Sequence, residues 1–305
     1  MFDKSLDQDH DQSSKMGAYF PRTYITGMYK FLLRNPEKFR IITYDDLSWS
    51  SKDKCFGNFP EEFKSWNKMI KADPVNGQKI HLMIQYDLDS RPDRAMDLLR
   101  EPCHRHVPVN IMLFNKRVDR KFLKASGKVK STPYEIDDKL LVKYQKDGSV
   151  VGYHSNANER GGFSIDGAMT AFDEDVAALR KRFIIDYYTA HGGIPGPDGT
   201  NNNGLPFPKN WEGDIRWVHN GSSPQFDGVF SDGGHNNKKR DPGKRDLRDF
   251  VLGLKPGRRY RMLLHPQYYD LRPKRSPTYG GTKWYDTLMD KYEKCETFDP
   301  WEHFE

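Results

Sequence analysis

Short apolar runs alternate with amphipathic stretches along most of the chain. Runs rich in β-branched and aromatic residues, bounded by polar or glycine-containing segments, predict strands. We place strands at 40–44, 79–86, 107–114, 150–153, 183–190, 228–230 and 260–264. Apolar residues at helical spacing predict helices between them. We place helices at 22–33, 61–72, 92–100, 132–145, 164–182, 246–252 and 282–292.

Local signals mark the starts of several of these helices. Pro21 and Pro92 stand where a proline is favoured in the first turn of a helix. Thr132 followed by Pro133 predicts a capped start, and Ser164 predicts another. A regular alternation of strands and helices favours a mainly parallel sheet covered by helices, either a barrel or an open sheet.

The chain shows no strong linker, so we expect a single domain at 18–305 after a disordered tail at 1–17. The segment 192–210, rich in Gly, Pro and Asn, is too long for a simple connection and is expected to contact substrate. An aromatic content of 13% compensates for a hydrophobic fraction of only 36%, so a folded core is expected.

Composition narrows the class of protein. No apolar run approaches the ~20 residues that span a bilayer, and the N-terminus has no secretory apolar region. Three scattered cysteines without a CxxC pair argue against a disulfide framework and favour a reducing cytoplasm. The net charge of +6 is concentrated at 238–248. That stretch is either a solvated loop or a site for phosphate or an anionic sugar, and it lacks the interleaved aromatics of nucleic-acid binders.

Candidate chemistry lies at the strand ends. Five predicted strands each lead, within two residues, into an aspartate or a histidine: Asp87 with Asp89, His154, His191, Asp232 and His265. In a parallel α/β architecture these ends share one face, where active sites form. A single aspartate or histidine at a strand end usually forms a turn or caps a helix, but five such strand ends together predict a shared site.

Asp87 and Asp89 are two residues apart, so in extended backbone their side chains point the same way. Two close carboxylates repel unless a cation relieves them, and a metal would take one as ligand and leave the other as general base. A turn that begins the next loop is the simpler alternative. His154 and His191 suit neutral imidazole ligands, or else they only anchor loops. His265 would protonate a leaving group, or bond a backbone carbonyl.

The order of motifs resembles the polysaccharide deacetylase (NodB-like) superfamily of carbohydrate esterases, most closely its lipopolysaccharide and capsule biosynthesis branch. The resemblance lies in the segments 86–95, 151–156, 190–193, 230–233 and 262–266, with a similar lead-in at 41–47. It implies a distorted, incomplete (β/α)7 barrel and metal-dependent removal of acetyl from an N-acetylated sugar. It also implies Asp87 as base, Asp89 and His154 as metal ligands, and His265 as acid.

The chain departs from the superfamily's H-x-x-x-H pattern, because Asn158 stands where the second histidine is expected. Either His191 supplies the third ligand, or Asn158 binds through its carbonyl, or the metal site is weakened. We favour His191, since imidazole is the better ligand for a zinc-like ion. The residues expected to contact substrate are Arg94, Asn156, Asn158, Gly192 and Asp232.

We therefore expect a cytoplasmic, zinc-dependent carbohydrate de-N-acetylase that acts on an acetylated amino sugar or its conjugate. It has no nucleic-acid partner, and the sequence leaves its oligomeric state open. Two other readings remain: a catalytically degenerate relative that binds a glycan or a partner, and a metal-dependent phosphoester hydrolase. No HExxH, Walker or GxSxG motif points to another class of enzyme.

Overall fold

The computed structural model describes residues 18–47, 77–202, 215–218, 226–232, 246–276 and 279–302. Its centre is an eight-stranded sheet in which every pairing is parallel. The strands are β2 (Phe39–Ile42), β3 (Ile80–Leu88), β4 (Asn110–Leu113), β7 (Val150–Ser155), β8 (Tyr187–Ala190), β9 (Arg216–Val218), β10 (Gly228–Ser231) and β11 (Arg259–Leu264). Each of the seven predicted strands has a counterpart among them.

The strand order is β10-β11-β3-β4-β7-β8-β9, with β2 paired to β3. From β3 to β9, neighbouring strands follow one another in chain order. The last two strands, β10 and β11, lie on the other side of β3, with β11 next to it. Within the described ranges, β9 and β10 are not paired. The predicted mixed α/β architecture is confirmed, and this order is consistent with a distorted, open barrel. A regular count of seven strand–helix units stays a prediction.

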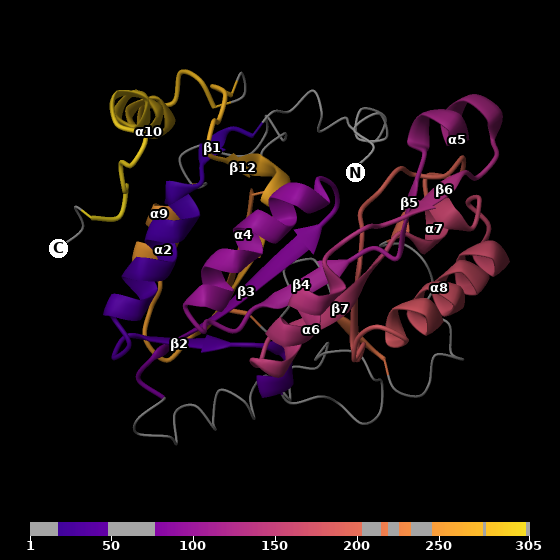
Figure 1. The fold of residues 1–305 in the computed structure, drawn as a ribbon, viewed down its shortest axis with the longest axis horizontal. Coiled ribbons are helices and arrows are strands. Elements are labelled where there is room, and N and C mark those ends of the chain that lie inside the picture. Colours follow the sequence, from indigo (N-terminus) through magenta and orange to yellow (C-terminus); the bar gives the residue numbers. More distant parts are fainter. Residues whose placement is uncertain are drawn as a thin grey trace.

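Helices cover one face of the sheet, as Figure 1 shows for α2, α4 and α6 beside β3, β4 and β7. The helices are α2 (Thr23–Arg34), α4 (Pro92–His104), α5 (Arg120–Ser126), α6 (Asp138–Lys146), α7 (Ala157–Arg160), α8 (Ile165–Arg180), α9 (Leu247–Leu252) and α10 (Lys283–Lys294). The predicted helix at 61–72 and the basic stretch up to residue 245 lie outside the described residues. No described helix is long and apolar enough to cross a membrane.

Two helix starts test the capping signals. The Ser164 hydroxyl accepts a hydrogen bond from the Gly167 N–H, so the predicted cap of α8 is confirmed. The predicted start at Thr132 is wrong. Residues 131–133 form β6 (Ser131–Pro133), antiparallel to β5 (Lys116–Val118), and α6 begins only at Asp138. Pro133 suits the edge of such a two-stranded ribbon because it needs no partner for an N–H.

The period-two alternation along β3 separates two environments. Ile80, Leu82, Ile84, Tyr86 and Leu88 belong to the large core that the helices cover. Residues at odd positions face the other way, and Met83 belongs there to a second, smaller cluster. The same inner face carries the buried polar side chains of Gln85 and Asp87. One face of the strand therefore supplies stability and the other supplies chemistry.

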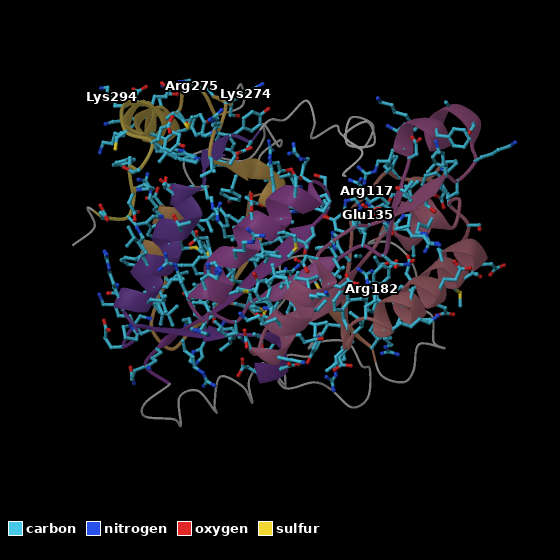
Figure 2. All side chains as sticks on the ribbon, viewed as in Figure 1. Arg117, Glu135, Arg182, Lys274, Arg275 and Lys294 are labelled. Carbon is cyan, nitrogen blue, oxygen red and sulfur yellow. The ribbon has the colours of Figure 1, made fainter. Side chains whose placement is uncertain are left out.

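The C-terminal segment packs against the first described residues of the chain. The two-residue strands β1 (Phe20–Pro21) and β12 (Tyr269–Asp270) pair in parallel, and Phe20 stacks on Trp284 of α10. Arg275 lies beside Lys274 near α10 (Figure 2). Its guanidinium binds Glu293 at 2.8 and 2.7 Å. This pair is exposed, so the aromatic packing holds the helix more strongly than the ions do.

Candidate active site

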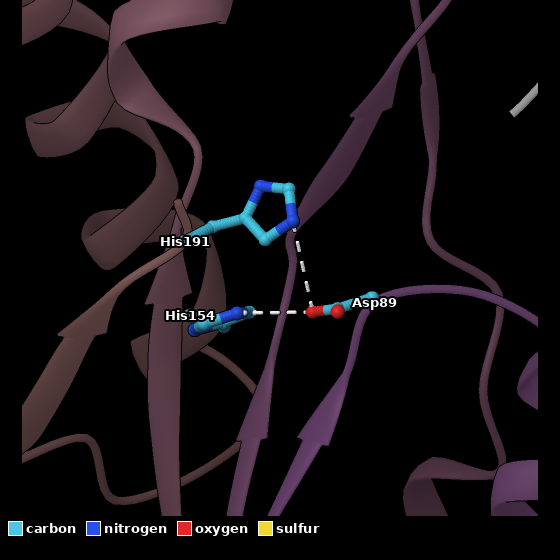
Figure 3. A group of neighbouring side chains, drawn as sticks. All are labelled: Asp89, His154 and His191. Atoms are coloured by element: carbon cyan, nitrogen blue, oxygen red, sulfur yellow. Dashed lines mark ion pairs between the residues drawn. The ribbon is translucent and has the colours of Figure 1, made fainter. Parts of the chain in front are cut away.

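Asp89, His154 and His191 meet at the carboxyl ends of β3, β7 and β8, with β4 between the first two of these strands. Asp89 follows β3, His154 lies near the end of β7, and His191 follows β8. Each offers one ligand atom, and these atoms all lie within 4.8 Å of one another. In Figure 3, His154 and His191 both point at the Asp89 carboxylate. Asp89 Oδ1 is 3.0 Å from His154 Nε2 and 3.9 Å from His191 Nε2.

The surroundings of His154 direct its Nε2 toward Asp89. Its Nδ1 lies 2.7 Å from the hydroxyl of Thr189, which is its register neighbour on β8. Thr189 is fully buried, so this contact fixes the ring. A metal-ligating histidine commonly has its second nitrogen held by such a polar partner.

The donor set fits a divalent cation. Asp89 Oδ1 is buried, and its contacts with His154 Nε2 at 3.0 Å and His191 Nε2 at 3.9 Å do not have regular hydrogen-bond geometry. A buried carboxylate oxygen with such imperfect contacts is costly, and a cation between the three groups would satisfy it. One carboxylate and two imidazoles form a ligand set that is typical of catalytic zinc.

Electrostatics keep Asp89 ionised. Burial alone would raise the pKa of Asp89, but His191, His154 and His265 outweigh it and hold the pKa far below its usual range. For His154, burial lowers the pKa, while Asp87 and Asp89 raise it above the ordinary value. In the absence of an ion, the cluster therefore carries protons that a bound cation would replace.

Asp87 lies next to the cluster on the inner face of β3, with only 2% of its surface exposed. The amide of Gln85 donates to Asp87 Oδ1 at 2.6 Å, and the Tyr44 hydroxyl donates to the Gln85 carbonyl oxygen. The other carboxylate oxygen, Oδ2, lies 3.6 Å from His154 Nε2. One oxygen is thus anchored, and the second faces the centre.

His265 approaches the cluster from β11. The Asp232 carboxylate accepts from the backbone N–H of His265 at 2.8 Å and contacts its Nδ1 at 2.5 Å. This leaves Nε2 facing Asp89 Oδ2 at 3.5 Å. Burial lowers the pKa of His265, but Asp232 outweighs it, and the pKa rises to about 10. At neutral pH the residue is an imidazolium that can donate a proton.

Two of the residues predicted to contact substrate, Arg94 and Asn156, join segments of the chain to one another. Arg94 donates to the Gln267 carbonyl at 3.1 Å and pairs with Asp270 at 2.7 Å, which ties α4 to the segment after His265. The Asn156 amide donates to the Lys116 carbonyl at 2.9 Å. Gly192 directly follows His191 in the chain. Their contacts with substrate stay predictions.

Asn158 anchors the segment that follows β8. Its side-chain nitrogen donates to the Thr200 carbonyl at 2.9 Å, and its backbone N–H donates to Asn202 Oδ1 at 2.7 Å. His191 completes the group of three potential ligands, whereas the Asn158 side-chain nitrogen is engaged with the Thr200 carbonyl. The choice of His191 over Asn158 as the third ligand stays a prediction.

Three supporting residues were missed by the sequence analysis. Gln85 and Thr189 stand two residues before Asp87 and His191, so the period of the strand places them on the same face and could have identified them. Glu159 has no comparable signal, because its role depends on a partner 32 positions away in the chain, His191. Burial would raise the pKa of Glu159, but His191 and Arg120 lower it to about 2.

No protein-family model matches the chain, and no curated protein matches it. Among solved structures, it is similar to a family 4 carbohydrate esterase from Bacillus anthracis, with a TM-score of 0.28 and 13% identity over 69% of this chain and 76% of that one. It is also similar to a mutant of a CE4 family pseudoenzyme with restored enzymatic activity, with a TM-score of 0.32 and 13% identity over 70% of this chain and 62% of that one. Both structural neighbours belong to the family 4 carbohydrate esterases, at low identity and low TM-score.

Proposed function

We propose that this protein is a metal-dependent hydrolase that removes the acetyl group from an N-acetylated sugar. The observation that carries the proposal is the cluster of Asp89, His154 and His191, with Asp87 and His265 against it. The order of strand-end motifs, which resembles the polysaccharide deacetylase superfamily, supports a sugar amide as substrate. Within that class, a precursor of surface polysaccharide such as O-antigen or capsule is the substrate that the resemblance favours.

Asp89, His154 and His191 would hold the ion, and their oxygen and nitrogen donors favour zinc. When bound, such an ion polarises a carbonyl oxygen and lowers the pKa of water toward ~7. Asp87 acts as the general base, taking the proton from the water that attacks the acetyl carbon. Gln85 holds Asp87 Oδ1, so Oδ2 is the oxygen that accepts the proton.

His265 acts as the general acid. When the bond between the acetyl carbon and the amine nitrogen breaks, the nitrogen needs a proton to leave as an amine. His265 carries that proton at neutral pH, because Asp232 stabilises its imidazolium form. The products are acetate and the free amino sugar.

Asp87→Asn tests this assignment, with Asp173→Asn on the exposed face of α8 as the matched control. Zinc content and acetate release are measured on a panel of N-acetylated sugars and nucleotide sugars. The Asp87 variant should keep its zinc and lose acetate release by at least ~100-fold, the range for general-base removal. The control should match the wild type, and a chelator should abolish activity in both.

Three results would overturn the proposal. Acetate release that survives complete removal of metal would rule out a metal-dependent reaction. Release of phosphate in place of acetate would assign the protein to phosphoester hydrolysis, and a protein that holds no zinc after reconstitution would be a degenerate binder.

A further inference from the structure

Glu159 lies buried behind His191, on the side away from Asp89. It belongs to α7, the short helix that follows His154, and only 1% of its surface is exposed. Its Oε2 lies 3.8 Å from His191 Nδ1, while His191 Nε2 lies 3.9 Å from Asp89 Oδ1. The imidazole therefore stands between two carboxylates, each near a different ring nitrogen.

The segment after His191 is built against the same carboxylate. Glu159 Oε1 accepts a hydrogen bond from the Ile194 N–H at 2.9 Å. Gly193 adopts a φ of +61°, and a Cβ at this position would lie 2.8 Å from Glu159 Oε1. Only glycine allows the backbone both this conformation and this approach. The backbone of Gly193 and Ile194 therefore packs directly against the Glu159 carboxylate, next to His191 in the chain.

Arg120 balances the buried charge. Its Nη2 lies 3.2 Å from Glu159 Oε1, and it lies 3.3 and 3.4 Å from His191 Nδ1 and Nε2, so the arginine does not choose between the two ring nitrogens. A buried carboxylate without a cation would be expensive, so this arginine allows Glu159 to stay ionised beside the ring. The group Arg120, Glu159 and His191 joins α5, α7 and the end of β8.

A neutral imidazole carries one proton, and only the nitrogen without it can bind a metal. A carboxylate next to Nδ1 favours the proton on Nδ1 and leaves the Nε2 lone pair toward Asp89. On this geometry, and resting on the metal-dependent function proposed above, we propose that Glu159 is a positioning residue that sets the tautomer and orientation of His191 as a ligand. The short helix after His154 thus contributes to metal binding indirectly, through a histidine on the next strand.

The test is zinc affinity, measured by competition with a chromophoric chelator, which needs no turnover. Glu159→Gln should weaken zinc binding by about 10- to 100-fold, the range for residues that orient a ligand. Glu296→Gln is the matched control, because Glu296 is exposed just after the end of α10. That control should bind zinc like the wild type. An unchanged affinity in Glu159→Gln, with zinc bound normally by the wild type, would overturn the positioning role alone.

A double-mutant cycle separates positioning from a general structural role. In a His191→Ala background, Glu159→Gln should cause no further loss of zinc affinity, because the ligand through which it acts is gone. An equal loss in both backgrounds would mean that Glu159 only supports the loop, which overturns the inference. A wild type that binds no zinc would instead defeat the proposed function itself.

If Glu159→Gln does not fold, the tautomer of His191 can still be measured in the wild-type protein. The side-chain ¹⁵N shifts of His191 in the zinc-loaded protein identify the nitrogen that carries the proton. A proton on Nδ1 supports the inference, and a proton on Nε2 overturns it.

Discussion

Phe114 lies nearly parallel to His154, with ring centroids 5.3 Å apart and planes inclined by 14°. The same ring meets His191 edge-on at 5.1 Å. Phe114 directly follows β4, a strand that supplies none of the charged groups of the site. The apolar ring of Phe114 packs against the imidazoles of His154 and His191 and shields the covered faces from water. Interactions between charges are stronger beside such an apolar surface than in water.

Replacing Phe114 should therefore damage both stability and zinc affinity. Phe114→Ala should cost about 3 kcal/mol of unfolding free energy, because it opens a cavity in a buried position. Phe114→Leu keeps most of the volume and should cost about 1 kcal/mol. Both should weaken zinc binding, since the rings lose their support. Urea unfolding measures the change in stability, and chelator competition measures the change in zinc affinity.

Phe122→Ala, on the exposed surface of α5, is the control and should change neither quantity. Full zinc affinity in Phe114→Ala would contradict the supporting role.

The pairing of Asp232 with His265 predicts a change in the pH profile. A histidine whose pKa is raised to about 10 stays protonated well above neutral pH, so the general acid is present until the pH approaches that value. Asp232→Asn removes the charge that raises this pKa. The alkaline limb of the kcat profile should therefore move down toward the ordinary histidine value of about 6.5, and kcat at pH 8 should fall.

The same variant should leave zinc affinity within a few fold of the wild type, because Asp232 contacts His265 and not the three candidate ligands. Asp173→Asn again serves as the control for loss of a carboxylate. An alkaline limb that stays in place in Asp232→Asn would show that His265 is not the acid.

Ser164 offers a stability prediction that is separate from the chemistry. Its hydroxyl caps α8 by accepting from the Gly167 N–H at 3.2 Å. Ser164→Ala should cost about 1 kcal/mol, and Ser164→Asp should be nearly neutral because a carboxylate can also cap a helix. Thermal unfolding of the two variants measures the difference. Equal stability of the alanine and aspartate variants would show that the cap contributes nothing.

Much of the site could be predicted because it follows the period of the strands. The groups at Asp87, His154 and His265 lie on or directly after buried strands, and parallel strands bring their carboxyl ends to one face. The prediction of His191 as a partner of Asp89 rested on the same reasoning, and the two lie together.

Other features depend on contacts that no local pattern records. Glu159 and Arg120 are partners across 39 residues, and neither lies in a recognisable motif. The segment at Thr132 carries a strong signal for a helix start, yet it pairs with Lys116–Val118 as a ribbon. Strand pairing with a distant segment outweighed the local preference there, which is a common reason for such errors.

β3 has two neighbours along one edge: β2 pairs with its first half, from Ile80 to Met83, and β4 with its second half, from Gln85 to Leu88. The segment that follows β2 therefore lies beside the start of β4. There the Tyr44 N–H donates to Asn110 Oδ1 at 2.9 Å, and the Tyr44 hydroxyl donates to Gln85. Tyr44 thus holds Gln85, which in turn holds Asp87, so a change at Tyr44 would displace the Asp87 carboxylate even if every strand stayed in place.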